Sequence, residues 1–311
     1  MKVIAAFFRL IRWPNLVFIV LTQALFRYFI LPFVYIEAHP GYDHIKLSQP
    51  LFFLLSFASV CIAGAGYIIN DYFDINIDLV NKSSKVIVGK FIKRRSAILL
   101  HGILSLTGLA LSIYVGYKIG NALIPFFNFL AILILWFYSS TFKKKLLIGN
   151  VLISLLTAWV ILVLTVAEYR FRISPHDIVW QRLLKVSFIY AGFAFIISLI
   201  REVIKDMEDL EGDTRYGCTT MPVVWGLPVS KVFTGVWIVV LTGLVIAIQI
   251  YVLQLGWWYS ALYSIIAIII PLLWVLKKLY TAGTPAEFHQ LSSAVKLIML
   301  AGIISMIFFK T

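Results

Sequence analysis

The chain has 311 residues, of which 61% are hydrophobic and only 13% are charged. This composition excludes an ordinary soluble domain and is typical of membrane proteins with many spans. The net charge is +13, but the basic residues are divided among short loops. That distribution argues against nucleic-acid binding and favours anionic lipid headgroups or phosphorylated substrates. The two cysteines indicate neither a disulfide framework nor a metal motif.

Nine stretches are long and apolar enough to cross a bilayer, which takes about 20 helical residues. In chain order they are 16–36, 51–70, 97–117, 120–140, 147–167, 186–204, 233–254, 257–276 and 292–309. The first has no convincing cleavage site after it, so we interpret it as a retained helix rather than a signal peptide. We therefore predict an all-α, polytopic membrane protein, a bundle of nine transmembrane helices that forms one domain over residues 1–311.

The basic residues predict the orientation of this bundle. With the N-terminus inside, the cytoplasmic segments hold 19 of the 27 lysines and arginines, the outer segments hold seven, and Arg27 lies in the first span. Lysine and arginine accumulate on the cytoplasmic side, so we predict a cytoplasmic N-terminus. Nine spans then place the C-terminus outside. The membrane is predicted to be that of a bacterial or archaeal cell.

The second span ends in an acidic cluster. It consists of Asp71, Asp74 and Asp78, preceded by Asn70. On a helix, the spacing i, i+3, i+7 places three carboxylates on one face. Like charges repel unless a cation neutralises them, so a divalent metal is the simplest explanation. The loop that follows carries Lys82 and Lys85, whose charges suit the oxygens of a metal-bound diphosphate.

The sixth span ends in a second cluster with the same spacing. Its aspartates are Asp206, Asp209 and Asp213, preceded by Arg201, Glu202 and Lys205. Even-numbered spans of an N-in protein end in the cytoplasm, so both clusters are predicted to face that compartment and share one substrate. Four helices separate them, which suggests a four-helix pseudo-repeat with the ninth helix added.

The residues alone leave other interpretations open. Acidic residues at helix ends can be solvated interface groups, although two equally spaced clusters on one side weaken that explanation. An ion-coupled transporter also carries intramembrane acids, usually near the midplane. A non-catalytic scaffold would leave the paired clusters unexplained. The lysines at 143–145 are typical of a topology signal, and Arg27 of a snorkelling or paired side chain.

At these residues the chain resembles the UbiA superfamily of intramembrane prenyltransferases, over most of its length. The family signature N-D-x-x-D-x-x-x-D matches residues 70–78, and an aspartate-rich segment ending the sixth helix matches residues 206–213. Weaker matches are Arg12-Trp13-Pro14-Asn15, similar to the R-P-x-N that opens the first helix, and Tyr138-Ser139, Lys143 and Asn150 after the fourth. One departure is the segment 81–89, which lacks the family's prolines and has Lys85 where arginine is common.

The resemblance implies Mg²⁺-dependent transfer of a prenyl chain from a prenyl diphosphate to a lipophilic acceptor, with the hydrocarbon tail between helices and open to membrane lipid. The second motif, followed by Thr220-Met221-Pro222-Val223, is similar to that of geranylgeranylglyceryl phosphate geranylgeranyltransferases. This implies geranylgeranylglyceryl phosphate or a similar acceptor. Homogentisate prenyltransferases and chlorophyll synthases share part of the motif, so an aromatic acceptor of quinone biosynthesis stays open. No protein partner is inferred.

The resemblance also implies roles for single residues. The metal ligands would be Asp71, Asp74, Asp78, Asp206, Asp209 and Asp213. Of these, Asp71, Asp74, Asp206 and Asp209 would be catalytic. The substrate-binding residues would be Arg12, Asn15, Asn70, Lys82, Lys85, Tyr138, Lys143, Arg201 and Lys205.

Overall fold

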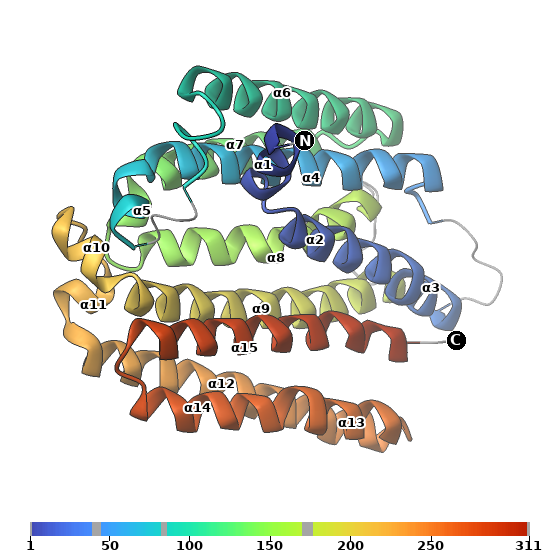
Figure 1. Cartoon of the computed structure of the whole chain (residues 1–311). Coiled ribbons are helices and arrows are strands. Elements are labelled where there is room, and N and C mark those ends of the chain that lie inside the picture. Colours follow the sequence, from blue (N-terminus) through green and yellow to red (C-terminus); the bar gives the residue numbers. More distant parts are fainter. Residues whose placement is uncertain (1, 39–44, 82–85, 170–176, 310–311) are drawn as a thin grey trace. The chain divides into compact units, whose positions relative to one another are not determined.

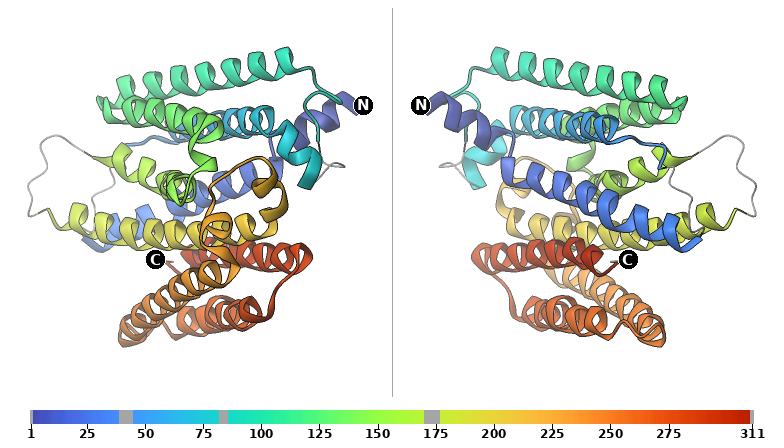
Figure 2. Two further views of the ribbon diagram at one scale, coloured as in Figure 1. Left: turned by 90° about the vertical axis from the view of Figure 1, so that its left-hand side faces the viewer. Right: turned by 90° about the vertical axis from the view of Figure 1, so that its right-hand side faces the viewer.

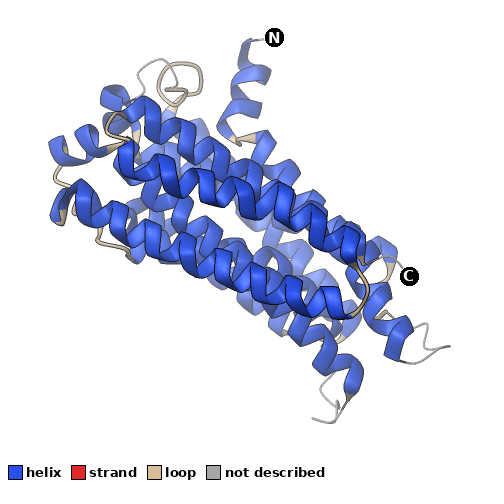
Figure 3. Ribbon diagram, turned by 90° about the horizontal axis from the view of Figure 1, so that it is seen from below, coloured by secondary structure: helices blue, strands red, loops and turns tan. Residues whose placement is uncertain are grey.

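The structure is a computed structural model that describes residues 2–38, 45–81, 86–169 and 177–309. Over these ranges the chain is built from helices and contains no β-strand (Figure 3). The predicted substrate-binding residues Lys82 and Lys85 lie outside the described residues. The all-α prediction is confirmed.

The chain forms two compact units. The first comprises Met1–Lys143 and Trp159–Phe188 with residue 311, and the second comprises Lys144–Ala158 and Ile189–Lys310. Helices α8 and α9 each run through both units. The prediction of a single domain over residues 1–311 stays a prediction.

The helices follow one another with short connections, as labelled in Figure 1. From the N-terminus they are α1 (Lys2–Leu10), α2 (Trp13–Leu25), η1 (Phe26–Ile30), α3 (Leu31–Ala38), α4 (Gln49–Phe73), α5 (Ile75–Asn81), α6 (Arg94–Ile119), α7 (Leu123–Ser140), η3 (Phe142–Lys144) and α8 (Ile148–Glu168). They continue with α9 (Ile178–Glu208), α10 (Leu210–Arg215), α11 (Met221–Val224), α12 (Gly226–Gln254), α13 (Trp258–Ser264), η4 (Ile265–Ile269), α14 (Ile270–Thr281), α15 (Pro285–Ile304) and η5 (Ser305–Phe308).

Nine helical segments within the described residues are long and apolar enough to cross a membrane, which confirms the predicted number. They are Trp13–Tyr35, Gln49–Phe73, Arg94–Ile119, Leu123–Ser140, Ile148–Glu168, Ile178–Glu208, Gly226–Gln254, Trp258–Thr281 and Pro285–Phe308. Several extend beyond the predicted spans because polar residues continue the helical hydrogen bonding past the apolar stretch. The second and sixth therefore include Asp71 and Asp206.

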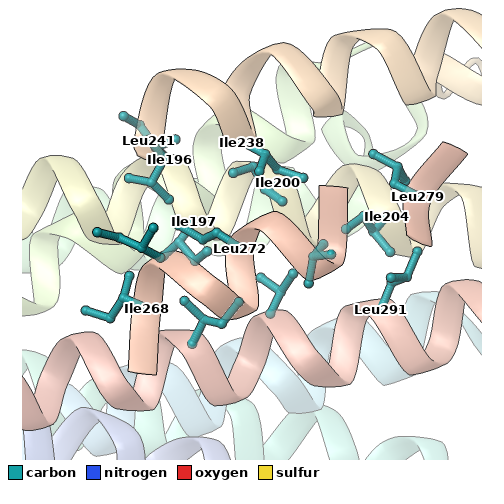
Figure 4. Close-up of a cluster of buried hydrophobic side chains, with 14 of the residues drawn as sticks. Ile196, Ile197, Ile200, Ile204, Ile238, Leu241, Ile268, Leu272, Leu279 and Leu291 are labelled. Atoms are coloured by element: carbon teal, nitrogen blue, oxygen red, sulfur yellow. The ribbon is translucent and has the colours of Figure 1, made fainter. Parts of the chain in front are cut away.

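The core of the second unit is a layer of branched aliphatic side chains. Figure 4 shows Ile197, Ile200 and Ile204 of α9 beside Leu272 of α14 and Ile238 of α12. Each of these five residues is at most 1% exposed. The α9 residues follow the i, i+3, i+7 spacing that places side chains on one helical face. Lipid tails are as apolar as these side chains, so close van der Waals packing stabilises the contact.

Glycine permits close helix approaches in each unit. In the first, a Cβ atom at Gly108 of α6 would lie 2.7 Å from a side-chain carbon of Ile62 on α4. In the second, a Cβ atom at Gly302 of α15 would lie 2.3 Å from the ring of Phe193 on α9. Small residues at these positions let the helices pack tightly without a driving force from water.

A buried carboxylate lies at the C-terminal end of α8, in the first unit. Glu168 is 2% exposed. Its Oε2 accepts hydrogen bonds from the Tyr35 hydroxyl at 2.9 Å and the Lys46 backbone N–H at 2.8 Å, and its Oε1 accepts one from the Leu47 N–H at 3.1 Å. The Lys46 ammonium donates to the Tyr169 carbonyl at 2.9 Å. Glu168 thus connects α3, the segment just before α4, and α8 through charge-assisted hydrogen bonds.

We expect Glu168→Gln to destabilise the protein by roughly 2–3 kcal/mol. The glutamine side chain would place its own N–H donors beside a hydroxyl and backbone N–H groups that also donate, so at least one of these donors would lose its acceptor. Tyr35→Phe removes only one hydrogen bond and should cost about 1 kcal/mol. Thermal unfolding in one detergent compares the two variants. Equal unfolding midpoints for Glu168→Gln and the unsubstituted protein would contradict this role.

Candidate active site

The first aspartate cluster lies where a long helix gives way to a short one (Figure 1). α4 ends at Phe73, Asp74 caps it with φ −88° and ψ −1°, and α5 begins at Ile75. The expectation of one continuous helical face carrying all three aspartates is therefore wrong in detail. Asp71 lies in the last turn of α4 and Asp78 in the first turn of α5, on either side of the break at Asp74.

Two basic side chains hold the carboxylates at this helix end. The Arg12 Nη2 donates to Asp71 Oδ1 at 2.8 Å. The Lys143 ammonium forms a short ion pair with Asp74 Oδ1 and lies 3.4 Å from Asn70 Oδ1. The side chains of Lys143 and Asp74 are 10% and 16% exposed, so this pair is shielded from bulk solvent, whereas the Arg12 side chain of the other pair is 37% exposed. The structure thus brings Arg12 and Lys143, which are 59 and 69 positions from their partners in the sequence, to the cluster of Asn70, Asp71 and Asp74.

Arg12 reaches this position through an unusual backbone conformation. It has φ 50° and ψ 51°, the left-handed region, at the N-cap of α2. For a residue with a Cβ atom this conformation costs roughly 1–2 kcal/mol, and such strain is often found at functional sites. The guanidinium also lies 5.2 Å from the centre of the Tyr67 ring. Burial lowers the pKa of Arg12, but the nearby Asp71 and Tyr67 raise it more, so its net shift is upward.

The other predicted residues that the structure describes in this unit each lie near the end of a helix. Asn15 is half-buried in the first turn of α2, and its backbone N–H donates to the Arg12 carbonyl at 2.8 Å. Asp78 is half-buried on α5, and Tyr138 is half-buried near the end of α7. Their predicted roles stay predictions.

The second cluster repeats the helix break of the first. α9 ends at Glu208, Asp209 follows with φ −95° and ψ 10°, and α10 begins at Leu210. In both clusters the middle aspartate therefore occupies the junction between a long and a short helix. Its backbone lies in the sparsely allowed bridge region, where many active-site residues are found.

Neighbouring polar groups orient the outer aspartates of the second cluster. Asn150 Nδ2 of α8 donates to Asp206 Oδ2 at 2.7 Å, and the Thr220 hydroxyl donates to Asp213 Oδ2 at 3.0 Å. Asn150 is buried and Thr220 is 3% exposed. Sequence reasoning assigned no role to either residue, although both belong to segments that resemble the family. Hydrogen-bond partners of this kind become visible only in the fold.

Glu202 is a further residue that the site prediction missed. Its Oε1 accepts from Arg201 Nη1 at 3.0 Å, and its Oε2 lies 3.5 Å from the Lys205 ammonium. Glu202 therefore pairs with the two cations of this cluster, Arg201 and Lys205, that were predicted to bind the substrate. Its position three residues before Lys205 on a helix is the sequence signal that indicates such a pair.

The donor chemistry of both clusters fits a hard divalent cation. Mg²⁺ prefers carboxylate oxygens, and the clusters supply Asp71 and Asp74 in one unit and Asp206, Asp209 and Asp213 in the other. Among the described residues, no three histidine, cysteine, aspartate or glutamate side chains converge as a metal-binding group. Arg12 and Lys143 occupy oxygens of two candidate ligands. The metal assignments stay predictions.

In the part of the chain that the structure describes, nine segments long and apolar enough to span a membrane, with an aspartate-bearing helix break in each unit, define the class, an integral membrane protein with polar chemistry at its helix ends. The sequence pattern of the UbiA prenyltransferase family matches residues 16–294. The chain belongs to the UbiA prenyltransferase family. This confirms the predicted class of enzyme, one that transfers prenyl groups.

Two archaeal relatives are digeranylgeranylglyceryl phosphate synthases. That of Methanothermobacter thermautotrophicus is 33% identical over 189 residues, which cover 59% of this chain and 60% of the relative. That of Korarchaeum cryptofilum is 30% identical over 246 residues, which cover 78% of this chain and 80% of the relative. The match to the first thus spans less than two thirds of that relative's length.

Solved structures share the fold. One, from work on digeranylgeranylglyceryl phosphate synthase, has a TM-score of 0.63 at 24% identity and covers 99% of each chain. Another is a UbiA homologue from Archaeoglobus fulgidus bound to GPP and Mg²⁺, with a TM-score of 0.56 at 14% identity, covering 97% of this chain and 99% of that one. Divalent metal and prenyl diphosphate are thus present in a protein of this fold.

Proposed function

We propose that this protein transfers a geranylgeranyl group from geranylgeranyl diphosphate to geranylgeranylglyceryl phosphate. The observation that carries the proposal is the end of α4, where Asp71, Asp74 and Asn70 lie with Arg12 and Lys143. Carboxylates for a metal and cations for phosphate oxygens are the groups that a prenyl diphosphate requires. The names of the archaeal relatives support the acceptor.

Bound Mg²⁺ would neutralise the negative charge that develops on the departing diphosphate. Asp71, Asp74 and Asp78 would hold it in one cluster, and Asp206, Asp209 and Asp213 in the other. Arg12, Lys143 and Asn70 would contact the remaining diphosphate oxygens, since a guanidinium and an ammonium stabilise anionic oxygens strongly.

The transfer itself exchanges one carbon–oxygen bond for another. The bond between the first prenyl carbon and the diphosphate oxygen breaks, and the diphosphate leaves with the electron pair. The allylic cation that remains is captured by the acceptor hydroxyl, which forms an ether bond. The hydroxyl proton passes to a carboxylate, for which we assign one of the aspartates at the helix breaks. Apolar faces of the spans would accommodate both hydrocarbon tails.

An aromatic acceptor is the second candidate. The K-D-x-x-D-x-E-G-D pattern at residues 205–213 is also similar to that of homogentisate prenyltransferases and chlorophyll synthases. The two acceptors differ in chemistry, since one offers an alcohol beside a phosphate and the other an activated ring carbon. The chain belongs to a family of prenyltransferases, so no observation now favours the ion-coupled transporter.

The decisive assay uses purified protein in detergent with geranylgeranyl diphosphate and each acceptor in turn. We expect transfer to geranylgeranylglyceryl phosphate with Mg²⁺, loss of activity in excess EDTA, and recovery when Mg²⁺ is restored, because the leaving diphosphate needs charge neutralisation. Full turnover in the chelator would contradict the metal role. Transfer to homogentisate alone would reassign the acceptor while retaining the enzyme class.

We further propose that the N-terminus and both aspartate-bearing helix ends face the cytoplasm. The uneven distribution of lysine and arginine supports this orientation. A cysteine at the exposed position Thr214, in a Cys218→Ser background, should resist an impermeant thiol reagent in intact cells and react after lysis. Labelling in intact cells would show that residue 214 faces the outside, which is the opposite of the proposed orientation.

A further inference from the structure

The first helix, α1, is amphipathic, and one of its apolar faces is exposed. Ala6 and Leu10, on one side, are 5% and 0% exposed. Ile4 and Phe8, on the other side, are 65% and 49% exposed. Each pair is four residues apart, which places its members on the same helical face. Exposed apolar side chains of this kind mark a surface that another phase or molecule covers.

The segment 86–95 packs against the buried face of α1. Val88 and Ile92, which are 1% and 7% exposed, share a hydrophobic cluster with Ala6 and Leu10. In the left-hand view of Figure 2, α1, α5 and the start of α6 lie toward the same side of the first unit. Phe91 turns outward and is 48% exposed. The segment and α1 therefore form one continuous surface, which we call the entry face.

The charges on the entry face are all positive. Its exposed basic side chains are Arg9, Lys90, Lys93, Arg94 and Arg95. Neither residues 2–12 nor residues 86–95 contain an aspartate or glutamate. Apolar side chains interleaved with cations complement an anionic lipid surface, whose headgroups attract the charges while its acyl region takes up Ile4, Phe8 and Phe91.

The entry face also lies where membrane spans begin. Two residues connect the end of α1 at Leu10 to the start of α2 at Trp13. The segment 86–95 includes the first two residues of α6, which starts at Arg94. Both spans expose large apolar side chains within their first two turns, with Trp13 53% exposed and Leu99 65% exposed. The same hydrophobic cluster contains Ile11, beside Arg12, and Ile75, beside Asp74.

We propose that the entry face binds anionic lipid headgroups in the plane of the membrane surface, and that this docking holds Arg12 and α5 in place at the aspartate cluster. Lipid is the occupant because the surface is continuous with two spans and uniformly cationic. The proposal does not depend on which prenyl acceptor the enzyme uses.

Hydrogen exchange of the full-length protein in lipid nanodiscs tests this docking. We expect amides of residues 4–11 and 86–95 to exchange on the order of tenfold more slowly in discs containing phosphatidylglycerol than in phosphatidylcholine discs. Raising the NaCl concentration should reduce the difference, because salt screens exposed charges. The variant Lys90→Gln/Lys93→Gln/Arg94→Gln/Arg95→Gln should abolish it. The matched variant Lys277→Gln/Lys278→Gln, whose exposed lysines lie at the end of α14, should keep it.

Equal exchange in the two kinds of disc would overturn the proposal, as would a difference that survives in the fourfold variant. Adding inorganic phosphate to phosphatidylcholine discs tests whether the entry face binds a free phosphate rather than a lipid surface. Protection by phosphate alone would assign the entry face to a soluble anion instead. Because the first comparison uses the unsubstituted protein, a variant that fails to fold leaves the test intact.

Discussion

Replacing Asp74 with asparagine is expected to lower the rate of prenyl transfer by about a thousandfold, which corresponds to ~4 kcal/mol of transition-state stabilisation. The substitution nearly preserves volume, and asparagine tolerates the backbone conformation at the end of α4. What it removes is an anionic oxygen at the position where Lys143 and the predicted metal converge. Initial rates of product formation at saturating Mg²⁺ measure the effect.

Substituting Lys143, the ion-pair partner of Asp74, distinguishes an effect on the reaction from an effect on folding. Lys143→Met should destabilise the protein by roughly 3 kcal/mol, because it leaves a shielded carboxylate without its counter-ion. Combining Lys143→Met with Asp74→Asn removes both charges and should restore most of the thermal stability without restoring activity. Recovery of activity in the double variant would show that the pair serves folding alone.

Asp177→Asn is a matched control for Asp74→Asn. Asp177 Oδ1 accepts a hydrogen bond from the Trp180 N–H at 3.1 Å, at the start of α9. Asparagine caps helices as well as aspartate does, so this variant should keep both stability and activity. A similar loss of activity in both variants would indicate a general sensitivity to charge rather than a role for Asp74.

Asp209→Asn is expected to cause a loss of activity comparable to that of Asp74→Asn. Asp209 occupies the junction between α9 and α10, as Asp74 does between α4 and α5. If both clusters act on one reaction, the double variant Asp74→Asn/Asp209→Asn should be little slower than either single variant, because groups that act as a unit are strongly non-additive. Rates of both single variants and the double variant, measured under the same conditions, test this.

Glu211→Gln serves as the control for the second cluster. Glu211 is an exposed carboxylate only two residues from Asp209, and its loss should leave the rate nearly unchanged. Near-full activity of Asp209→Asn beside an inactive Asp74→Asn would exclude a shared reaction and require a different role for the second cluster. Multiplicative losses in the double variant would indicate two independent contributions.

The sequence by itself determined the fold class and the membrane spans. Runs of about 20 apolar residues have one stable solution in a bilayer, since a helix satisfies every backbone hydrogen bond internally. The aspartate spacing at residues 71–78 and 206–213, with its resemblance to the UbiA family, was sufficient to predict the enzyme class that the comparisons support.

Only the tertiary structure decided which side chains meet. The contacts of Arg12 with Asp71 and of Lys143 with Asp74 join residues separated by 59 and 69 positions, and no local pattern encodes such a distance. The breaks at Asp74 and Asp209 were likewise not predicted, because helical spacing continues through them in the sequence. Glu168 illustrates the same limit, since a lone carboxylate at a span end acquires its three donors only when distant segments pack around it. Periodicity and composition act over a few turns of helix, whereas ion pairs and caps depend on the packing of whole helices.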